Sequence, residues 1–291
     1  MALPLPHVEG VEHRYVEANG VRLHVAEAGD GEPLVLLHGW PQHWYEWRDV
    51  IGPLAERYRV ICPDLRGLGW SEAPDAGYDK ETLASDVIAL IEALGLERVR
   101  LAGHDWGGFV GFLICLCRPD LVERYLALNI IHPWPRLDAR ALMDLWRPAH
   151  VYVLSSPVLG QRLLRHAPSA VRKLLQLGSE CRDAFSESEL DAFARPLSEP
   201  ARARATVALY RTFLLREMPA LARGRYADVR LRTPTLFLFG AADRAVPPRA
   251  LSGIEDHADD IEIELVPDVG HFIVDEQPEL VIRRALEFFA A

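Results

Sequence analysis

A glycine-rich turn, Gly103 to Gly108 (GHDWGG), constrains the fold of this chain more than any other segment. The β-like run Val99 to Ala102 precedes the turn, and the apolar, helix-like run FVGFLICLC follows it. Glycines at 103, 107 and 108 let the backbone turn sharply, and such a turn lifts one side chain above the end of a sheet. The lifted residue is Asp105. We therefore expect a strand, a tight turn and a helix, with a carboxylate presented at the turn.

Asp105 has two interpretations. It could simply cap the helix, since Asp is a preferred N-cap residue. It could also be a nucleophile on an elbow of the form G-x-S-x-G, with Asp in place of Ser. Asp243 follows the strand-like run TLFLFG, and His271 follows the run IEIELV and a short turn. Each could be a turn or interior residue, but the order nucleophile, acid, histidine favours a catalytic triad.

A second turn, His38 to Pro41 (HGWP), follows the predicted strand Pro33 to Leu37. Its place suits a loop that supplies a main-chain N–H group to an oxyanion hole. We assign the two donors to the N–H groups of Trp40 and Trp106, because a negative oxygen needs fixed dipoles aimed at it. The alternative is that HGWP is only a turn.

Short β-like runs alternate with helical segments between Glu12 and Gly103, which is typical of a mostly parallel sheet covered by helices, an α/β fold. The clearest strands are Val21 to Ala26, Pro33 to His38, Tyr58 to Cys62, Val99 to Gly103 and Tyr125 to Asn129. The segment from Glu81 to Leu94 has a helical apolar face and stops at Gly95.

From about Pro133 to about Arg223 no strong strand occurs, and Leu, Ala and Arg recur at helical spacing. Strand character then returns. The later elements are the strands Pro234 to Gly240 and Ile261 to Val266 and a closing helix from Pro278 to Phe289. The predicted organisation is a core in two parts, residues 1–132 and 224–291, separated by a helical insertion, residues 133–223.

The formal charge of −10 argues against a surface that binds the phosphate backbone of nucleic acid, and it favours a small neutral or cationic ligand. The four cysteines lack the spacing of a zinc site or the density of a disulfide scaffold. No leader-like start and no apolar run long enough to span a bilayer is evident. These features predict a cytoplasmic protein with no membrane or nucleic-acid partner.

With these motifs in place, the chain resembles the epoxide hydrolases of the α/β-hydrolase superfamily over nearly its whole length. The matching stretches are His38 to Arg48 (HGWPQHWYEWR), Asp64 to Ser71 (DLRGLGWS), Gly103 to Gly108, Asp243, and Gly270-His271. DLRGLGWS taken alone is interpreted as structural packing. The resemblance implies the α/β-hydrolase fold, with a helical cap inserted after the sixth strand.

The resemblance also implies two proton-donating side chains in the cap, usually tyrosines, aimed at the nucleophile. Tyr210 matches the second donor. At the first position this chain departs from the pattern, because His150 stands there, and Tyr152 is the alternative two residues later. His150 is ambiguous, since related fluoroacetate dehalogenases use a histidine to hold halide, and plain cap packing would also explain any of the three. Residues expected to line the substrate pocket are His38, Trp40, Trp106 and Trp146.

A carboxylate can displace at saturated carbon and leave an alkyl ester, which water activated by His271 and Asp243 would hydrolyse. The leading hypothesis is therefore a hydrolase that acts on the ether bond of a small epoxide with water and requires no metal or organic cofactor. A haloalkane or haloacid dehalogenase using the same two steps ranks second, because Trp40 is not the expected halide donor. A non-catalytic hydrolase-fold binding protein ranks third. A homodimer is left open.

Overall fold

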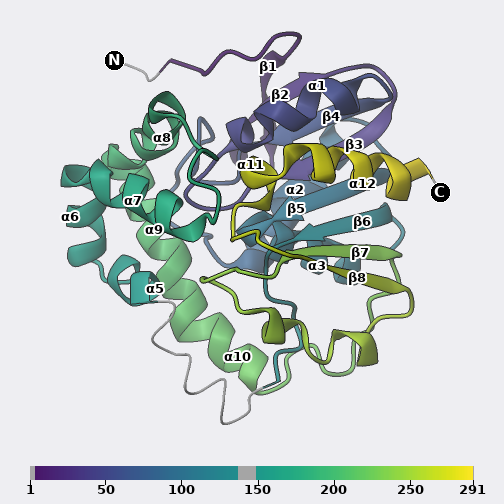
Figure 1. The fold of residues 1–291 in the computed structure, drawn as a ribbon. Helices are drawn as coiled ribbons and strands as arrows, with labels where there is room; N and C mark the ends of the chain where they lie inside the picture. The colour runs from purple at the N-terminus through teal and green to yellow at the C-terminus, as the bar shows by residue number, and fades with distance from the viewer. Residues whose placement is uncertain (1–3, 137–148, 291) are drawn as a thin grey trace.

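The computed structural model describes residues 4–136 and 149–290. Its centre is an eight-stranded sheet in the order β1-β2-β4-β3-β5-β6-β7-β8 (Figure 1). The strands are β1 (Glu12–Ala18), β2 (Val21–Ala28), β3 (Glu32–Leu37), β4 (Tyr58–Pro63), β5 (Val99–His104), β6 (Val122–Leu128), β7 (Thr235–Gly240) and β8 (Ile261–Val266). β2 runs antiparallel to both of its neighbours, and every other adjacent pair is parallel. The predicted mostly parallel α/β sheet is confirmed.

The edge strand β1 was not resolved as a separate strand by the sequence pattern. It pairs along its whole length with β2, from Glu12 opposite Glu27 to Ala18 opposite Val21. Asn19 and Gly20, which join the two strands, have φ values of 50° and 72°. An Asn-Gly pair with positive φ at both residues is the strongest short-range hairpin signal, so the dipeptide itself could have predicted this strand.

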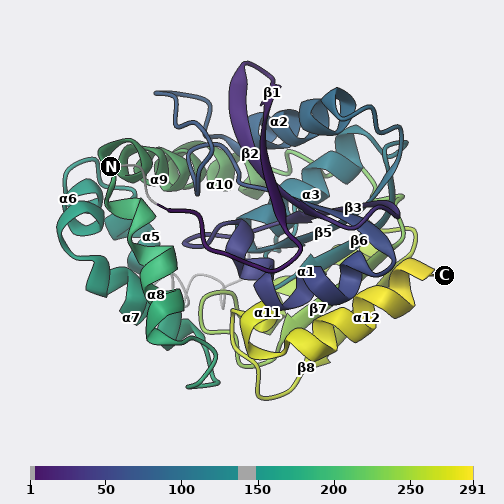
Figure 2. The same cartoon turned by 90° about the horizontal axis from the view of Figure 1, so that it is seen from above.

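Two layers of helices cover the sheet (Figure 2). On one face, α1 (Arg48–Ala55) and α12 (Pro278–Ala290) pack on each other and on side chains such as Leu36 and Leu126. On the other face, α2 (Lys80–Ala93) and α3 (Asp105–Cys117) pack on Val35, Leu101 and Ala127. Successive strand residues point to opposite faces, so each central strand contributes to both cores. The predicted helices at 81–94 and 278–289 are both present; the first begins and ends one residue earlier, and the second ends one residue later.

The strands' carboxyl ends are aligned by the register of the parallel ladder. Leu37 of β3 lies opposite Gly103 of β5, and Leu128 of β6 lies opposite both His104 of β5 and Leu238 of β7. Each strand therefore delivers its next residues to the same edge of the sheet. The chemical groups predicted at 38–41, 105 and 243 all follow these ends.

Within the predicted insertion, the described residues 149–222 are mostly helical, and from here on the helical insertion means this segment. It comprises α5 (Ala149–Leu154), α6 (Leu159–His166), α7 (Pro168–Gly178), α8 (Glu187–Ala194), α9 (Pro200–Thr212), a π-helical segment (Phe213–Glu217) and α10 (Met218–Ala222). Shorter elements are α11 (Ile273–Glu276) and the 3-10 turns Trp44–Trp47, Pro196–Ser198, Pro248–Leu251 and Ile254–Asp256. In Figure 1 the insertion stands at one end of the sheet, beside the loops that follow the strands.

Candidate active site

Asp105 stands on a tight turn between β5 and α3. Its φ is +48°, a left-handed conformation that is rare for a residue with a side chain. Glycines at positions 39 and 107 allow neighbouring segments of the chain to pack closely around the turn. A Cβ atom on Gly107 would lie 2.3 Å from the carbonyl oxygen of Leu37, and one on Gly39 would lie 2.4 Å from the Cβ atom of Asp105. The turn is therefore the strained elbow that the spacing of Gly103, Gly107 and Asp105 predicts.

His271 and Asp243 meet Asp105 at this edge of the sheet. The Nε2 atom of His271 lies 3.3 Å from Oδ2 of Asp105, and its Nδ1 atom lies 2.8 Å from Oδ2 of Asp243. All three residues are buried. The structure thus brings together three predicted residues that are separated by as many as 166 positions in the chain.

Asp243 is held in place by donors on both carboxylate oxygens. The N–H groups of Ala245 and Val246 donate to Oδ1 at 2.7 and 2.9 Å, and the side-chain amide of Asn129 donates to Oδ2 at 2.8 Å. Asn129 also donates to the carbonyl of Gly270 and accepts from the N–H of Gly240, both at 3.0 Å. The sequence showed only that Asn129 is no rival acid; its role as a bridge between the Asp243 and His271 loops was missed.

The electrostatics of the triad favour an ion pair. Burial alone would raise the pKa of the Asp105 carboxyl, but the hydrogen bond and charge of His271 lower it below its usual value. Burial opposes the charged imidazole of His271, yet the charge of Asp243 and the contacts with both carboxylates raise its pKa well above the usual value. Asp105 is consequently an ionised carboxylate, the form that a nucleophile requires.

The HGWP loop supplies one N–H group to the carboxylate. The main-chain N–H of Trp40 donates to Oδ1 of Asp105 at 2.9 Å. Trp106 is the second residue of α3, where main-chain N–H groups have no partner within the helix. These are the two positions at which sequence analysis placed the oxyanion donors.

Tyr210 of α9 lies over the two tryptophans. Its ring is edge-on to Trp40 at 5.1 Å and to Trp106 at 5.7 Å between centroids. Burial and the charge of Asp105 raise the pKa of the Tyr210 phenol well above its usual value, although a contact with Trp106 opposes this. The phenol therefore stays protonated and can donate a hydrogen bond.

His150, rather than Tyr152, stands beside Tyr210. The rings of His150 and Tyr210 are 6.1 Å apart between centroids and nearly perpendicular. Burial, and then the charge of His271, lowers the pKa of His150, so its ring is neutral at neutral pH. Tyr152 is 43% exposed, whereas Tyr210 and Asp105 are buried, so the alternative of Tyr152 as donor is corrected. Trp146 lies outside the described residues.

The two tryptophan indoles differ in their polar contacts. The Nε1 atom of Trp40 donates to Oγ1 of Thr206 in α9 at 3.2 Å. The Nε1 atom of Trp106 is buried and has no hydrogen-bond partner among the described residues. The indole N–H of Trp106 is therefore available to a ligand beside the Tyr210 phenol, and that of Trp40 is not.

His38 was predicted to line the pocket, and its contacts contradict this. Nε2 accepts the N–H of Leu65 at 2.9 Å, and Nδ1 lies 2.9 Å from the carbonyl of Gly39. Both ring nitrogens are thus used by the main chain in a fully buried position. The histidine shapes the HGWP loop and has no free polar atom for a substrate.

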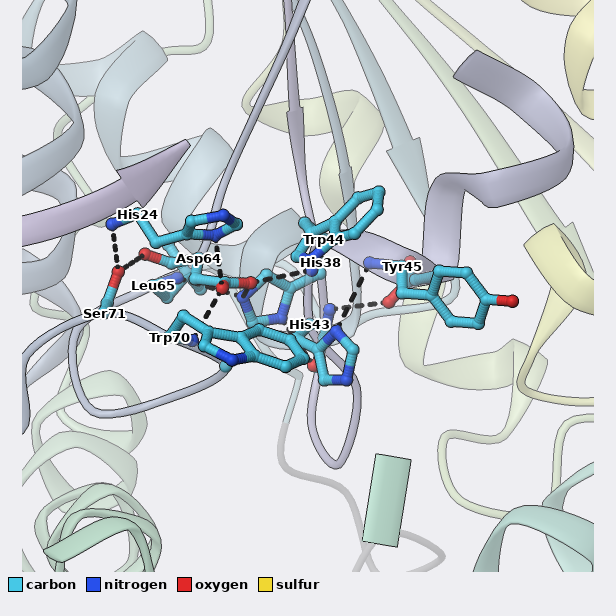
Figure 3. Close-up of polar contacts among 12 residues, drawn as sticks. His24, His38, His43, Trp44, Tyr45, Asp64, Leu65, Trp70 and Ser71 are labelled. Carbon is cyan, nitrogen blue, oxygen red and sulfur yellow. Dashed lines mark hydrogen bonds and ion pairs between the residues drawn. The ribbon is translucent and has the colours of Figure 1, made fainter. Parts of the chain in front are cut away.

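A buried polar cluster around Asp64 supports that loop (Figure 3). The carboxylate of Asp64 accepts the N–H groups of Trp44 and Trp70, each at 2.8 Å, and contacts Nδ1 of His24 at 2.8 Å. Burial acts to raise the pKa of Asp64, but His24 and the other nearby histidines lower it overall. The DLRGLGWS segment thus has a packing role, since Asp64 binds the main-chain N–H of Trp44 and so holds the first residue of the turn Trp44–Trp47.

In the described part of the chain, His, Cys, Asp and Glu side chains form no group of three or more arranged to hold a metal ion. Within the same residues, no helix combines the length and the apolar character needed to cross a bilayer.

Comparisons with known proteins agree with this fold. A profile for the α/β hydrolase fold matches residues 32–278. The chain therefore belongs to the α/β-hydrolase family. A soluble epoxide hydrolase of Corynebacterium sp. (strain C12) is 36% identical, over 96% of this chain and 98% of the relative. The solved structure of the epoxide hydrolase CorEH without ligand has 35% identity and a TM-score of 0.85, over 96% of this chain and 99% of that one.

Haloalkane dehalogenase 2 of Mycobacterium tuberculosis (strain ATCC 25618 / H37Rv) is 32% identical, over 98% of both chains. The resemblance to the epoxide hydrolases within the family is confirmed, and the dehalogenase relative is the weaker match.

Proposed function

We propose that this protein is an epoxide hydrolase that forms a covalent alkyl ester on Asp105 and then hydrolyses it. The observation that carries the proposal is a buried carboxylate, in place of a serine hydroxyl, on the elbow and within 3.3 Å of the Nε2 atom of His271. A carboxylate suits displacement at saturated carbon, and the epoxide hydrolase among the relatives supports an epoxide as the electrophile.

In the first step, an oxygen of Asp105 attacks a ring carbon of the epoxide. The C–O bond to that carbon breaks, and the ring oxygen leaves as an alkoxide. The phenol of Tyr210 hydrogen-bonds this oxygen and gives it a proton, and His150 lies beside Tyr210 to hold the same oxygen. The protonated state of the buried phenol supports its role as the acid.

In the second step, water attacks the carboxyl carbon of the ester. Nε2 of His271 takes a proton from the water, Asp243 stabilises the imidazolium, and the N–H groups of Trp40 and Trp106 hold the oxyanion. Esterification removes the negative charge of Asp105, which is one cause of the raised pKa of His271. The pKa of His271 therefore falls once the ester has formed, so the imidazolium can release its proton to solvent and the neutral ring becomes available as the base. Collapse of the intermediate breaks the ester C–O bond and releases the diol, whose second hydroxyl group takes the proton from the His271 imidazolium. The remaining proton of the water leaves the Asp105 carboxyl group and returns through solvent to the Tyr210 phenolate, which restores both residues.

We infer that the helical insertion acts as the cap of this site. It carries Tyr210, His150 and Thr206, and it is joined to the core by contacts close to the triad. The N–H of His271 donates to the carbonyl of Gly178 at 2.8 Å, at the end of α7. The predicted three-part division of the chain is consistent with this role.

A dehalogenase is the second candidate, and the free indole N–H of Trp106 favours it. A halide leaving group needs N–H donors but no proton. The indole of Trp40, which would be the second donor, is already bonded to Thr206. The epoxide function therefore ranks first, because Tyr210 supplies the proton that an alkoxide requires.

Mass spectrometry of a His271→Gln variant incubated with styrene oxide tests the proposal. The expected result is a covalent adduct, one per chain, on the peptide that contains Asp105, because the ester forms but is not hydrolysed. Asp105→Asn is the matched control and should show no adduct. The wild type should release diol from epoxides and little halide from haloalkanes. Halide release without diol would favour the dehalogenase, and no adduct with no turnover would favour a binding protein.

A further inference from the structure

A buried pair of ionisable side chains lies behind Asp105, and the two-step chemistry above leaves it without a role. His104 immediately precedes Asp105 and is fully buried, and Glu46 of the turn Trp44–Trp47 is 1% exposed. The Nδ1 atom of His104 lies 3.0 Å from Oε1 of Glu46. Neither buried atom has a hydrogen-bond partner in the described part of the chain, so this 3.0 Å ion-pair contact is the one charge partner that each has there.

The far ends of the pair contact two parts of the site. The Nε2 atom of His104 lies 2.8 Å from the main-chain carbonyl of His271. Oε2 of Glu46 accepts the N–H of Gly39 at 3.0 Å, and Gly39 directly precedes Trp40, whose N–H contacts Asp105. The pair therefore connects the loop of His271, the general base, with the loop of Trp40, an oxyanion donor.

The contacts fix the proton count of the pair. Both ring nitrogens of His104 face oxygen acceptors, a carbonyl at one end and a carboxylate at the other. A neutral imidazole has only one N–H, so a neutral ring beside an ionised Glu46 would set a nitrogen lone pair against an oxygen lone pair. Two protonated ring nitrogens satisfy both contacts, which makes His104 a buried imidazolium paired with a carboxylate.

We infer that His104 and Glu46 form a buried ion pair that positions the His271 loop and the Trp40 amide for hydrolysis of the ester. This inference rests on the proposed function, because it assigns the pair to the second of the two proposed steps. Neither residue touches substrate, so both are positioning residues. The first step is carried by Asp105 and the Tyr210 phenol and uses neither the His271 base nor the oxyanion, so we expect the pair to matter chiefly in the second step.

The surrounding charges agree with an imidazolium at His104. Burial opposes it, but the charge and contact of Glu46 raise the pKa of His104 above its usual value, and Asp105 adds to this effect, while the nearby His271 acts against it. On the side of Glu46, Asp275 pairs with Arg48 at 2.7 Å. Burial, and after it the charge of Glu46, raises the pKa of Asp275 to about 7 against the opposing effect of Arg48, as expected beside an ionised Glu46.

Rapid-quench mass spectrometry with styrene oxide tests the inference, with Glu46→Gln and His104→Gln as variants. The rate of ester formation should match that of the wild type, and the rate of ester decay should fall by about 10- to 100-fold, the cost of small misplacements in an active site. His132→Gln is the matched control, since it removes another fully buried histidine, whose Nδ1 atom accepts the N–H of Trp134 at 3.2 Å. It should lower the Tm without slowing ester decay. Slower ester formation with normal decay in the two variants, or no change in either rate, would overturn the inference.

Nitrogen-15 NMR of the histidine rings in the wild-type protein provides a readout that does not depend on turnover. The signals that disappear in His104→Gln should show two protonated ring nitrogens at pH 8. A single N–H on His104 at that pH would refute the ion pair, even where a Glu46 variant fails to fold. Absence of any adduct in His271→Gln would instead refute the proposed function and leave this measurement valid.

Discussion

Two tyrosines of the helical insertion differ in the feature that matters for acid catalysis, namely where the hydroxyl group lies. Tyr210 is buried against Trp40 and Trp106, and Tyr152 is 43% exposed on α5. Both occur in helices of the insertion, α5 and α9, so their positions in the sequence alone do not separate them. The distinction comes from the packing of α9 on the core, which a helical pattern does not specify.

Replacement of Tyr210 by Phe should lower kcat/KM for an epoxide by about 100-fold, because a positioned general acid contributes at least this much. Tyr152→Phe removes the same hydroxyl from an exposed ring and should leave kcat/KM unchanged. Steady-state kinetics on both variants measure the difference. Equal effects of the two substitutions would contradict the assignment of Tyr210.

At the same scale, the residues of the site were predictable to different degrees. Asp105, Asp243 and His271 could be predicted because each follows a strand in a recognisable order. His38 was misassigned because a histidine in a loop gives no sign of whether its nitrogens face a ligand or the main chain. Asn129 was overlooked because its function depends on two loops that meet only in three dimensions.

At the level of elements, α2 is joined to the end of the helical insertion by a fully buried lysine. The ammonium of Lys80 lies 2.7 Å from Oε2 of Glu217, donates to the carbonyl of Leu209 at 3.2 Å, and stands 4.4 Å from the ring centre of Trp106. Burial lowers the pKa of Lys80, and Glu217 counteracts this effect. The lysine therefore holds the turn that follows Tyr210 against the tryptophan of the elbow.

Lys80→Met should lower the free energy of unfolding by about 3 kcal/mol, because it leaves the carboxylate of Glu217 without its partner. The double variant with Glu217→Gln should recover part of that loss. The pair Arg225–Glu81 also involves α2 but is half exposed, so Arg225→Met should cost less than about 1 kcal/mol. Urea denaturation measures all three. Equal costs for the Lys80 and Arg225 substitutions would show that burial of the pair is unimportant.

The elements themselves were largely predictable, because seven strands and two helices of the core carry clear periodicity. The hairpin formed by β1 and β2 was not, since β1 is an edge strand whose residues are mostly exposed and polar. Its turn residues, Asn19 and Gly20, were the better signal.

For the whole molecule, contacts between core and insertion should make stability depend on pH. Nε2 of His43 lies 3.1 Å from the carbonyl of Ala192 in α8, and Nδ1 accepts the N–H of Tyr45 at 3.4 Å. Burial lowers the pKa of His43 from 6.5 to about 4. The unfolded chain therefore takes up this proton at a higher pH than the folded chain. The stability associated with the neutral ring is complete above pH 6.5 and is lost as the pH falls towards 4.

Urea denaturation at several pH values measures this contribution by comparing the wild type with His43→Gln. The free energy of unfolding of the wild type, relative to the variant, should fall by about 3 kcal/mol between pH 7 and pH 4, because each pKa unit corresponds to about 1.4 kcal/mol. His166→Gln alters an exposed histidine and should show no such trend. A constant difference between the wild type and His43→Gln across this range would contradict the predicted linkage.

The central claim is that Asp105 itself becomes esterified, and a single turnover in water enriched in oxygen-18 tests it most directly. With enzyme in excess over styrene oxide, the hydroxyl group added to the diol should carry ordinary oxygen donated by Asp105. Mass spectrometry should then find oxygen-18 in the carboxylate of the Asp105 peptide, because the water attacks the carboxyl carbon. Oxygen-18 in the first diol formed, with none in that peptide, would mean that water attacks the epoxide directly and would contradict the account.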